Sequence, residues 1–165
     1  AFEQTKSVPV QFFSDGEPAE AQHVWRSPWG RIGICICYDL GYTRVVDELI
    51  RQGAEALVVP TMDLQSWGRR EHELHARVAP VRSREYGVSI FRVCSSGISQ
   101  LVRCGRVIAE APFPGQGATL AGTLAMRSGS LPLDRRFAPW MSASVPFILL
   151  ALWLVRRRPR HGSAT

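Results

Sequence analysis

The chain has 165 residues, of which 45% are hydrophobic, and its formal net charge is +6. This size and apolar content predict one domain with a core of its own. Residues 131–165 hold six arginines and one aspartate, whereas residues 1–130 hold 14 basic and 13 acidic residues. Because a nucleic-acid-binding domain carries its positive charge over a folded surface, this distribution argues against nucleic acid as a partner.

The first half of the chain alternates between strand-like and helix-like segments. Residues 22–30 predict a short strand and turn that lead into an apolar strand at residues 31–37. Apolar residues at helical spacing, followed by Gly53, predict a helix in "TRVVDELIRQG". The segment "AEALVVP" predicts the next strand, ended by Pro60.

The second half begins with a helical pattern at residues 68–87, interrupted by Pro80 and stopped by Gly87. Four further strands are predicted, at residues 88–96, 98–104, 106–111 and 118–126. The order of these segments indicates an α/β fold with parallel strands first and hairpins after them.

The segment from Phe137 to Val155 has no charged residue over nineteen positions. As a helix it is about 28 Å long, close to the hydrocarbon thickness of a bilayer. Trp140 and Trp153 lie near its ends, and an arginine-rich segment follows. We expect a transmembrane helix here; the alternative is a buried C-terminal helix.

Cys37 is predicted at the end of an apolar strand, where an α/β sheet presents its chemistry. A thiol there can use the following backbone N–H groups to hold an oxyanion, although it needs activation. Packing is the alternative role, and it is the simpler explanation of Cys35, which lies between two isoleucines.

Lys6 is the only lysine among twenty basic residues. Its compact ammonium fits against a thiolate or a substrate oxygen in a way that a guanidinium does not. A coding bias toward arginine is the other explanation of a single lysine.

The segment "GRIGICICYDL", together with an upstream lysine, resembles the carbon–nitrogen hydrolase (nitrilase) superfamily. "RQGAEALVVPTMD" continues the resemblance, and "HARVAPVRSREYGVSIFRVCSSGIS" is similar to the apolipoprotein N-acyltransferase branch, so the match covers roughly residues 5–125. The resemblance implies the C-terminal portion of a nitrilase-type α-β-β-α sandwich, followed here by a single transmembrane helix.

The family uses a Glu-Lys-Cys triad, and the resemblance assigns Cys37 as the nucleophile and Lys6 as the cation beside it. The Tyr38 backbone N–H then helps to hold the oxyanion, Asp39 holds the turn around the nucleophile, and Glu17 is a candidate supporting acid. Asp39 as a plain turn cap is the alternative.

The sequence departs from the family in two ways. The triad glutamate lies well upstream of the lysine, and Glu3, the only acid before Lys6, is too close to it. We therefore expect a piece of a longer protein that is inactive alone. Residues 41–43 and 95–97 also differ from the usual amidase pattern, so substrate details do not transfer.

A metal site is a competing interpretation, since the chain offers several thiols and imidazoles (Cys35, Cys37, His72, His75, Cys94 and Cys104). The CxxC spacing of structural zinc sites is missing, and histidines three residues apart are common on helices, so neither a metal nor a cofactor is predicted. We expect His72 and His75 on a helix surface.

The order of segments predicts a hydrolase domain at residues 1–130, a linker at 131–136, the membrane helix at 137–155 and a basic tail at 156–165. The hydrophobic tail favours N-acyl transfer from a phospholipid to the α-amine of a lipoprotein. A membrane-anchored amidase acting on a small amide and an inactive binding or scaffold remnant are the alternatives. The excess of arginine after the helix predicts a cytoplasmic C-terminus and a catalytic domain on the outer, periplasmic side.

Overall fold

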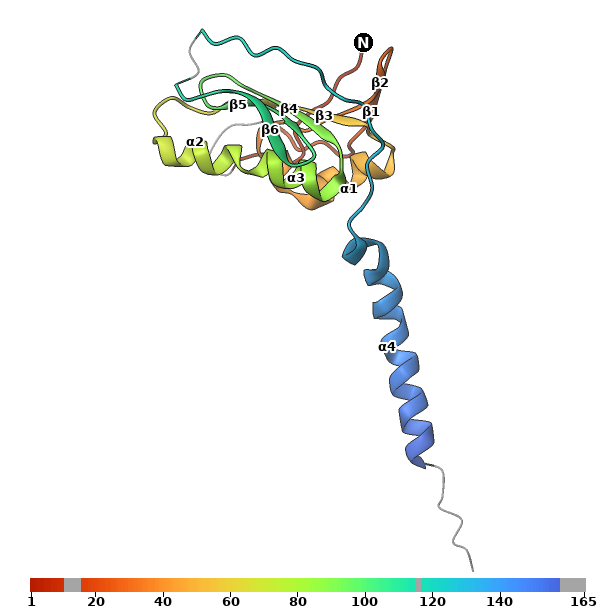
Figure 1. The fold of residues 1–165 in the computed structure, drawn as a ribbon. Coiled ribbons are helices and arrows are strands. Elements are labelled where there is room, and N and C mark those ends of the chain that lie inside the picture. Colours follow the sequence, from red (N-terminus) through yellow and green to blue (C-terminus); the bar gives the residue numbers. More distant parts are fainter. Residues whose placement is uncertain (11–15, 115–116, 158–165) are drawn as a thin grey trace, which may run out of the picture. The chain divides into compact units, whose positions relative to one another are not determined.

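A mixed sheet of six strands organises the part of the chain before the apolar tail (Figure 1). The computed structural model describes residues 1–10, 16–114 and 117–157. The chain divides into two units, Ala1–Leu131 and Pro132–Thr165. The strands follow one another in the sheet in the order in which they occur in the chain.

The centre of the sheet is parallel and consists of β2 (Gly30–Ile34), β3 (Ala56–Thr61) and β4 (Ser89–Cys94). Helix α1 (Thr43–Arg51) connects β2 to β3, and α2 (Arg69–Ala76) with α3 (Val78–Tyr86) connects β3 to β4. Because such crossovers have one hand, the helices lie on the same face of the sheet (Figure 1). The carboxyl ends of β2, β3 and β4 therefore meet at one edge.

The flanks of the sheet are antiparallel. Strand β1 (Val24–Ser27) pairs with β2, and β5 (Ser99–Arg103) and β6 (Arg106–Ala111) extend the sheet beyond β4. Cys104 and Gly105 join β5 to β6 with φ angles of 51° and 75°. This two-residue turn matches the twist of a hairpin, as expected from its glycine.

The core lies between the sheet and α1–α3 because both carry apolar side chains toward each other. On α1, residues at helical spacing are buried (Val45, Val46, Leu49 and Ile50). They contact apolar residues of the central strands and of α3 (Leu57, Val59, Ala79, Val88 and Ile90). This packing fixes the ends of the strands, where the chemistry was predicted.

Several predicted boundaries move in the structure. The strand expected at 31–37 ends at Ile34, and Cys37 begins a short 3₁₀ helix, η1 (Cys37–Gly41). Strand β3 runs one residue past Pro60. The helix interruption expected from Pro80 is confirmed but falls at Arg77, because a proline ring clashes with the carbonyl four residues earlier.

The strand predicted at residues 118–126 is wrong. Residues 118–126 have no regular secondary structure and are mostly exposed. Small residues interrupt the apolar ones in this segment, so its side chains bury too little surface to add a strand to the sheet. After this segment, single backbone hydrogen bonds join the chain to the rest of the unit, such as the bond from Arg127 N–H to the carbonyl of Glu55.

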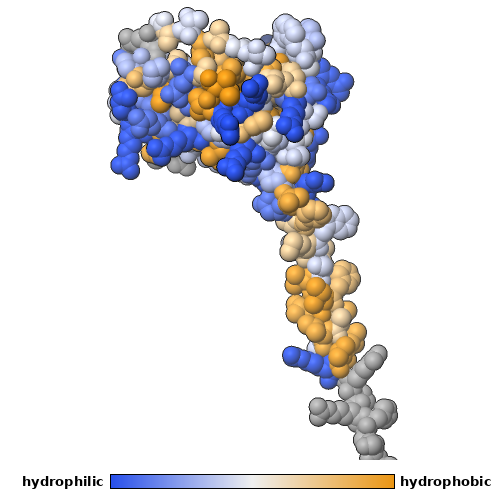
Figure 2. All heavy atoms as spheres, viewed as in Figure 1, coloured by the Kyte–Doolittle hydropathy of each residue, from blue (hydrophilic) through white to orange (hydrophobic). Residues whose placement is uncertain are grey.

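The described residues of the second unit form one helix, α4 (Leu133–Arg157), which begins inside the segment predicted as a linker. Its residues from Leu133 to Arg156 are long and apolar enough to cross a membrane, and none of its most apolar stretch is buried within the protein. Figure 2 shows apolar side chains along its length. The helix is therefore a candidate membrane span, and the described residues do not bury it as a core helix. Most of the basic tail lies outside the described residues.

Candidate active site

Cys37 occupies a strained turn at the carboxyl edge of β2. Its φ angle is 54°, a left-handed value that only Cys37 and Cys104 adopt among the described non-glycine residues. Such backbone strain persists only where the surrounding structure enforces it, and it is concentrated at functional sites. The sequence predicted a cysteine at the end of a strand, but not this turn.

Cys37 as a residue is 8% exposed to solvent, and its Sγ lies 3.9 Å from the carbonyl oxygen of Met62. Burial raises the pKa of Cys37 above its ordinary value, and the negative charge of Asp63 adds to this effect. A backbone contact with Met62 and the positive charge of Lys6 offset part of the increase in this pKa. The resting side chain is therefore a thiol that needs an acceptor for its proton.

Lys6 is buried and belongs to an N-terminal segment that runs beside η1. The positive charge of Lys6 acts to lower the pKa of Cys37, so the ammonium lies near enough to the thiol to affect it electrostatically. The carbonyl of Lys6 accepts a hydrogen bond of 2.8 Å from Ala19 N–H. Lysines are rarely buried unless they are paired, so the burial of Lys6 argues against the role of an ordinary surface lysine.

Asp39 ties the segment that carries Lys6 to the turn that carries Cys37. Its carboxylate is fully buried and accepts hydrogen bonds from the backbone N–H groups of Ser7 (3.0 and 3.1 Å) and Val8 (2.7 Å). It also accepts one from Ile36 N–H at 3.3 Å, within its own turn. A carboxylate with these contacts holds two distant segments together, which is more than a turn cap does.

The two remaining predicted site residues differ in their surroundings. Tyr38 follows the nucleophile, and its ring is half-exposed and packs edge-on against Tyr42 and His75. Glu17 is exposed to solvent, whereas Lys6, Cys37 and Asp39 are all buried. The structure therefore buries Lys6, Cys37 and Asp39 and leaves Glu17 at the surface.

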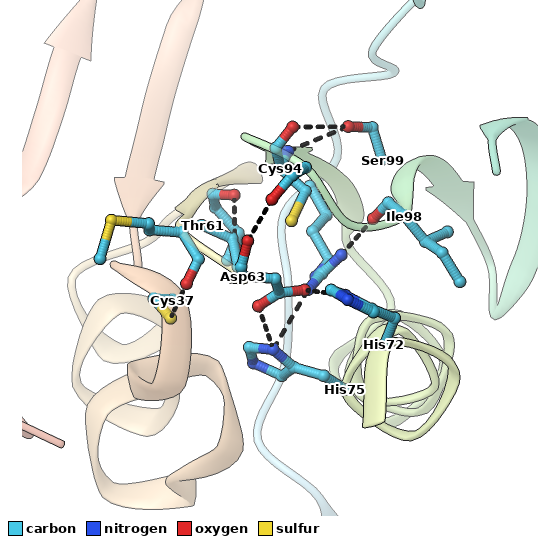
Figure 3. A network of polar contacts seen from close by, with 12 residues as sticks. Cys37, Thr61, Asp63, His72, His75, Cys94, Ile98 and Ser99 are labelled. Carbon is cyan, nitrogen blue, oxygen red and sulfur yellow. Dashed lines mark hydrogen bonds and ion pairs between the residues drawn. The ribbon is translucent and has the colours of Figure 1, made fainter. Parts of the chain in front are cut away.

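A second polar cluster, centred on Asp63, lies beside Cys37 (Figure 3). Asp63 follows the end of β3 and is almost fully buried. Its Oδ1 lies 2.8 Å from Nδ1 of His75, and its Oδ2 accepts a hydrogen bond of 2.7 Å from Arg92, which is also buried. Burial alone raises the pKa of Asp63, but the bonds from His75 and Arg92 outweigh it and hold this pKa well below its usual range.

The expectation that both histidines lie on a helix surface is wrong. His72 is fully buried, its ring stacks on Phe113 at 4.1 Å, and its Nδ1 lies 3.6 Å from Oδ2 of Asp63. His75 is half-buried against Asp63. Charged neighbours on α2 suggested a solvated face, but Asp63 contacts both histidines and the ring of Phe113 stacks on His72.

Sequence reasoning also missed Asp63 and Arg92 as site residues. Two signals were present: Asp63 comes directly after a predicted parallel strand, at the same edge as Cys37, and Arg92 interrupts an otherwise apolar strand. A charge within a buried strand needs a partner of opposite charge. The partner is Asp63.

The side chains of Cys37, Asp63 and His75 each place a potential metal-ligand atom within 4.8 Å of the others. Both carboxylate oxygens of Asp63 are already engaged, however, and the Arg92 guanidinium lies 3.2 Å from Nδ1 of His75. That positive charge opposes a bound cation. The donor set fits a hydrogen-bonded network better than a metal centre.

The four cysteines are all free thiols. Cys35 is fully buried in the core, as predicted, and the pKa of its thiol is raised above its ordinary range, chiefly because the side chain is completely buried. Cys94 is half-buried, and Cys104 is exposed in the hairpin turn. Cys37 is the cysteine that combines backbone strain with neighbouring charged groups.

Comparison with curated proteins gives a partial match. The chain is 33% identical over 84 residues to an apolipoprotein N-acyltransferase from Chlamydia pneumoniae, a match that covers 50% of this chain and 16% of that protein. No protein-family model matches the chain. The chain thus spans about a sixth of the length of its curated relative.

Solved structures share the fold at low identity. They include Nit3 of Saccharomyces cerevisiae, a member of the nitrilase superfamily (22% identity, 61% of this chain and 40% of that chain, TM-score 0.52). A glutamine-dependent NAD+ synthetase from Acinetobacter baumannii is also similar (12% identity, 77% and 29%, TM-score 0.60). A third is an amidase from Nesterenkonia with acrylamide added to its active-site cysteine (18% identity, 68% and 47%, TM-score 0.53).

The chain has part of a nitrilase-type fold, and its resemblance to the carbon–nitrogen hydrolase superfamily, with an apolipoprotein N-acyltransferase among its relatives, is confirmed.

Proposed function

We propose that the intact protein transfers an acyl chain through a thioester on Cys37, from a phospholipid to the α-amine of a lipoprotein. The observation that carries this proposal is the buried unit of Cys37, Lys6 and Asp39. It brings a strained thiol and a cation together over more than thirty residues of sequence. The relative from Chlamydia pneumoniae and the candidate membrane span support acyl transfer over other chemistry of this fold.

In the first half-reaction, the sulfur of Cys37 attacks the ester carbonyl carbon, and a C–S bond forms. The carbonyl oxygen becomes an oxyanion, which the Lys6 ammonium and the Tyr38 backbone N–H stabilise. The ester C–O bond then breaks, and the lysophospholipid oxygen leaves with the proton that came from the thiol. In the second half-reaction, the amine attacks the thioester carbonyl and releases the sulfur.

The experiment incubates the intact protein with a phospholipid that carries labelled acyl chains and maps the label by mass spectrometry. We expect a hydroxylamine-sensitive adduct on Cys37 that is lost in Cys37→Ala. Cys35→Ser is the matched control, since it alters a buried core thiol and should cost stability but keep the adduct. An adduct on Cys35, Cys94 or Cys104 contradicts the assignment.

Adding an acceptor separates the candidate reactions. A synthetic lipopeptide with a free α-amine should become N-acylated as the thioester disappears. Release of free fatty acid with no acylated peptide would show that water resolves the thioester and would favour a membrane-anchored hydrolase, for which a small amide is the next substrate to test. An intact protein that forms no adduct from any ester or amide would support an inactive binding or scaffold role.

A further inference from the structure

Arg82 on α3 reaches the short helix η1 that begins with Cys37. Its Nε donates a hydrogen bond of 3.1 Å to the carbonyl of Leu40, and its Nη2 donates one of 2.7 Å to the carbonyl of Gly41. These are the last two carbonyls of η1. We propose that Arg82 is a positioning residue, which holds η1 so that the Tyr38 backbone N–H points at the oxyanion. This inference rests on the proposed function of Cys37 as nucleophile.

The guanidinium of Arg82 suits this task because of its shape. The carbonyls at the end of a helix have no partner within it, so they need a donor from another part of the fold. A guanidinium presents its N–H groups as a rigid, planar fork, and Arg82 places two of them on neighbouring carbonyls. Its third nitrogen, Nη1, pairs with Glu85 on the same helix. The Arg82 side chain is only 14% exposed, so most of the fork is shielded from competing water.

The helix η1 is therefore held on two sides. The carboxylate of Asp39 accepts hydrogen bonds from its own turn and from the N-terminal segment, while Arg82 holds the last carbonyls from α3. Cys37 has a φ angle of 54°, which a non-glycine residue keeps only when its surroundings enforce it. The two anchors supply this restraint, because they fix the short helix of which Cys37 is the first residue.

The position of this turn matters for the oxyanion. Tyr38 follows Cys37 directly, so the direction of the Tyr38 N–H depends on the backbone angles of Cys37. A donor stabilises an oxyanion only when it points at the place where the negative charge develops. If η1 loses its anchor on α3, Cys37 can relax toward a negative φ angle, and the Tyr38 N–H then turns away from that place.

The charge of Arg82 acts on the core. Burial raises the pKa of the Cys35 thiol, and the guanidinium offsets part of this increase. The pKa of Cys37 instead responds to burial and then to the charges of Lys6 and Asp63. We therefore expect a change at Arg82 to leave the ionisation of Cys37 unaltered while it disturbs the acylation step.

The test compares two reactions of Cys37 in the intact protein, each followed by peptide mass spectrometry. Acylation by the labelled phospholipid forms an oxyanion, whereas alkylation by iodoacetamide does not. In Arg82→Ala, the maximal rate of acylation should fall about a hundredfold, while the phospholipid concentration at half-maximal rate changes by less than about twofold. Alkylation should stay within about threefold of the wild-type rate at every pH, because it needs no oxyanion donor.

Two further measurements separate positioning from general stability. Arg82→Lys keeps the positive charge but replaces the fork with one ammonium, so acylation should still be about tenfold slower than in the wild type. This variant also carries the comparison if the alanine variant does not fold. Guanidinium added to Arg82→Ala, below the concentration that unfolds the protein, should restore part of the acylation rate. General destabilisation does not predict such a rescue.

Arg84→Ala and Tyr86→Phe are the matched controls. Arg84 is exposed and lies on the same helix. Tyr86 donates a buried hydrogen bond of 2.6 Å to Asp47, so Tyr86→Phe lowers the free energy of unfolding without removing a donor to η1. Both folded variants should acylate Cys37 at close to the wild-type rate.

The outcomes distinguish the two proposals. If wild-type Cys37 forms no acyl adduct, the proposed function fails, and this inference fails with it. If the wild type is acylated and both Arg82 variants match its rate, the proposed function stands and the role of Arg82 is overturned. A parallel loss of acylation and alkylation in these variants would also overturn it, because the thiol itself would then be affected.

Discussion

Individual residues carry the chemistry through their surroundings rather than their identity. The chain contains four free cysteines, but only Cys37 combines a left-handed backbone with burial. Burial raises the pKa of its thiol, and the same burial strengthens each electrostatic contact around it. A buried nucleophile of this kind depends on Lys6 for charge and on a base for its proton.

Replacing Lys6 with arginine tests whether a compact ammonium is required. The guanidinium is larger and planar, so it cannot approach both the sulfur and the oxyanion in a buried space. We expect Lys6→Arg to reduce the rate of Cys37 acylation by about a hundredfold or more. The rate of thioester formation measures this, with Arg26→Lys, at an exposed position of β1, as the control. Near-normal acylation in Lys6→Arg would show that the reaction does not require a compact ammonium at this position.

At the scale of elements, the parallel centre of the sheet brings the site together. Cys37 and Asp63 lie beyond the carboxyl ends of β2 and β3, which face the same edge because these strands are parallel. Helix α2 returns along that edge and adds His75. The N-terminal segment with Lys6 is outside the sheet. Hydrogen bonds from this segment to the Asp39 carboxylate hold it against η1.

Asp39→Asn tests this connection. Val8 N–H donates to one carboxylate oxygen and Ile36 N–H to the other, whereas an amide offers one acceptor oxygen, so one of these two N–H groups loses its partner. We expect a loss of about 1–3 kcal/mol in the free energy of unfolding, measured by urea denaturation, and at least a tenfold slower Cys37 acylation.

Asp47→Asn is the control for this experiment. Asp47 is also a buried acid, and it accepts a hydrogen bond from Tyr86 on the far side of α1. The variant should lose stability while Cys37 acylation is unchanged in folded protein. Equal effects of both variants on acylation would show that Asp39 contributes stability alone.

At the scale of the whole molecule, the chain combines part of a nitrilase-type fold with a helix that is a candidate membrane span. Its match to the curated relative spans 16% of that protein. The charge on either side of the apolar stretch of α4, residues 137–155, suggests an orientation: Arg135 and Arg136 precede this stretch together with Asp134, whereas four arginines follow Val155 without an acid.

We predict a cytoplasmic C-terminus, because positive charge in short flanks stays on the cytoplasmic side. The hydrolase unit is then on the outer side, which is also where a lipoprotein acceptor would be reached. A reporter fused after Thr165 should be active only in the cytoplasm, and an impermeant thiol reagent should label Cys104 in intact cells. Labelling of Cys104 only after lysis would reverse the orientation and favour the anchored amidase.

Local patterns in the sequence determined much of the fold and part of the site. The spacing of apolar residues predicted α1, the strands from β2 to β6 and the apolar stretch of α4, because periodicity reports which face of an element is buried. The segment around Cys37 was recognisable because a nucleophile and the residues that shape its turn are neighbours in the chain.

Only the tertiary structure decided how the site is completed. Asp39 bonds to Ser7 across 32 residues of sequence, and Asp63 pairs with Arg92 across 29. Such pairs depend on strand order and on the path of the crossovers, which no local pattern encodes. The same reason explains His75: its neighbours in the chain are charged and suggested solvent, but its neighbours in space are a carboxylate and a thiol.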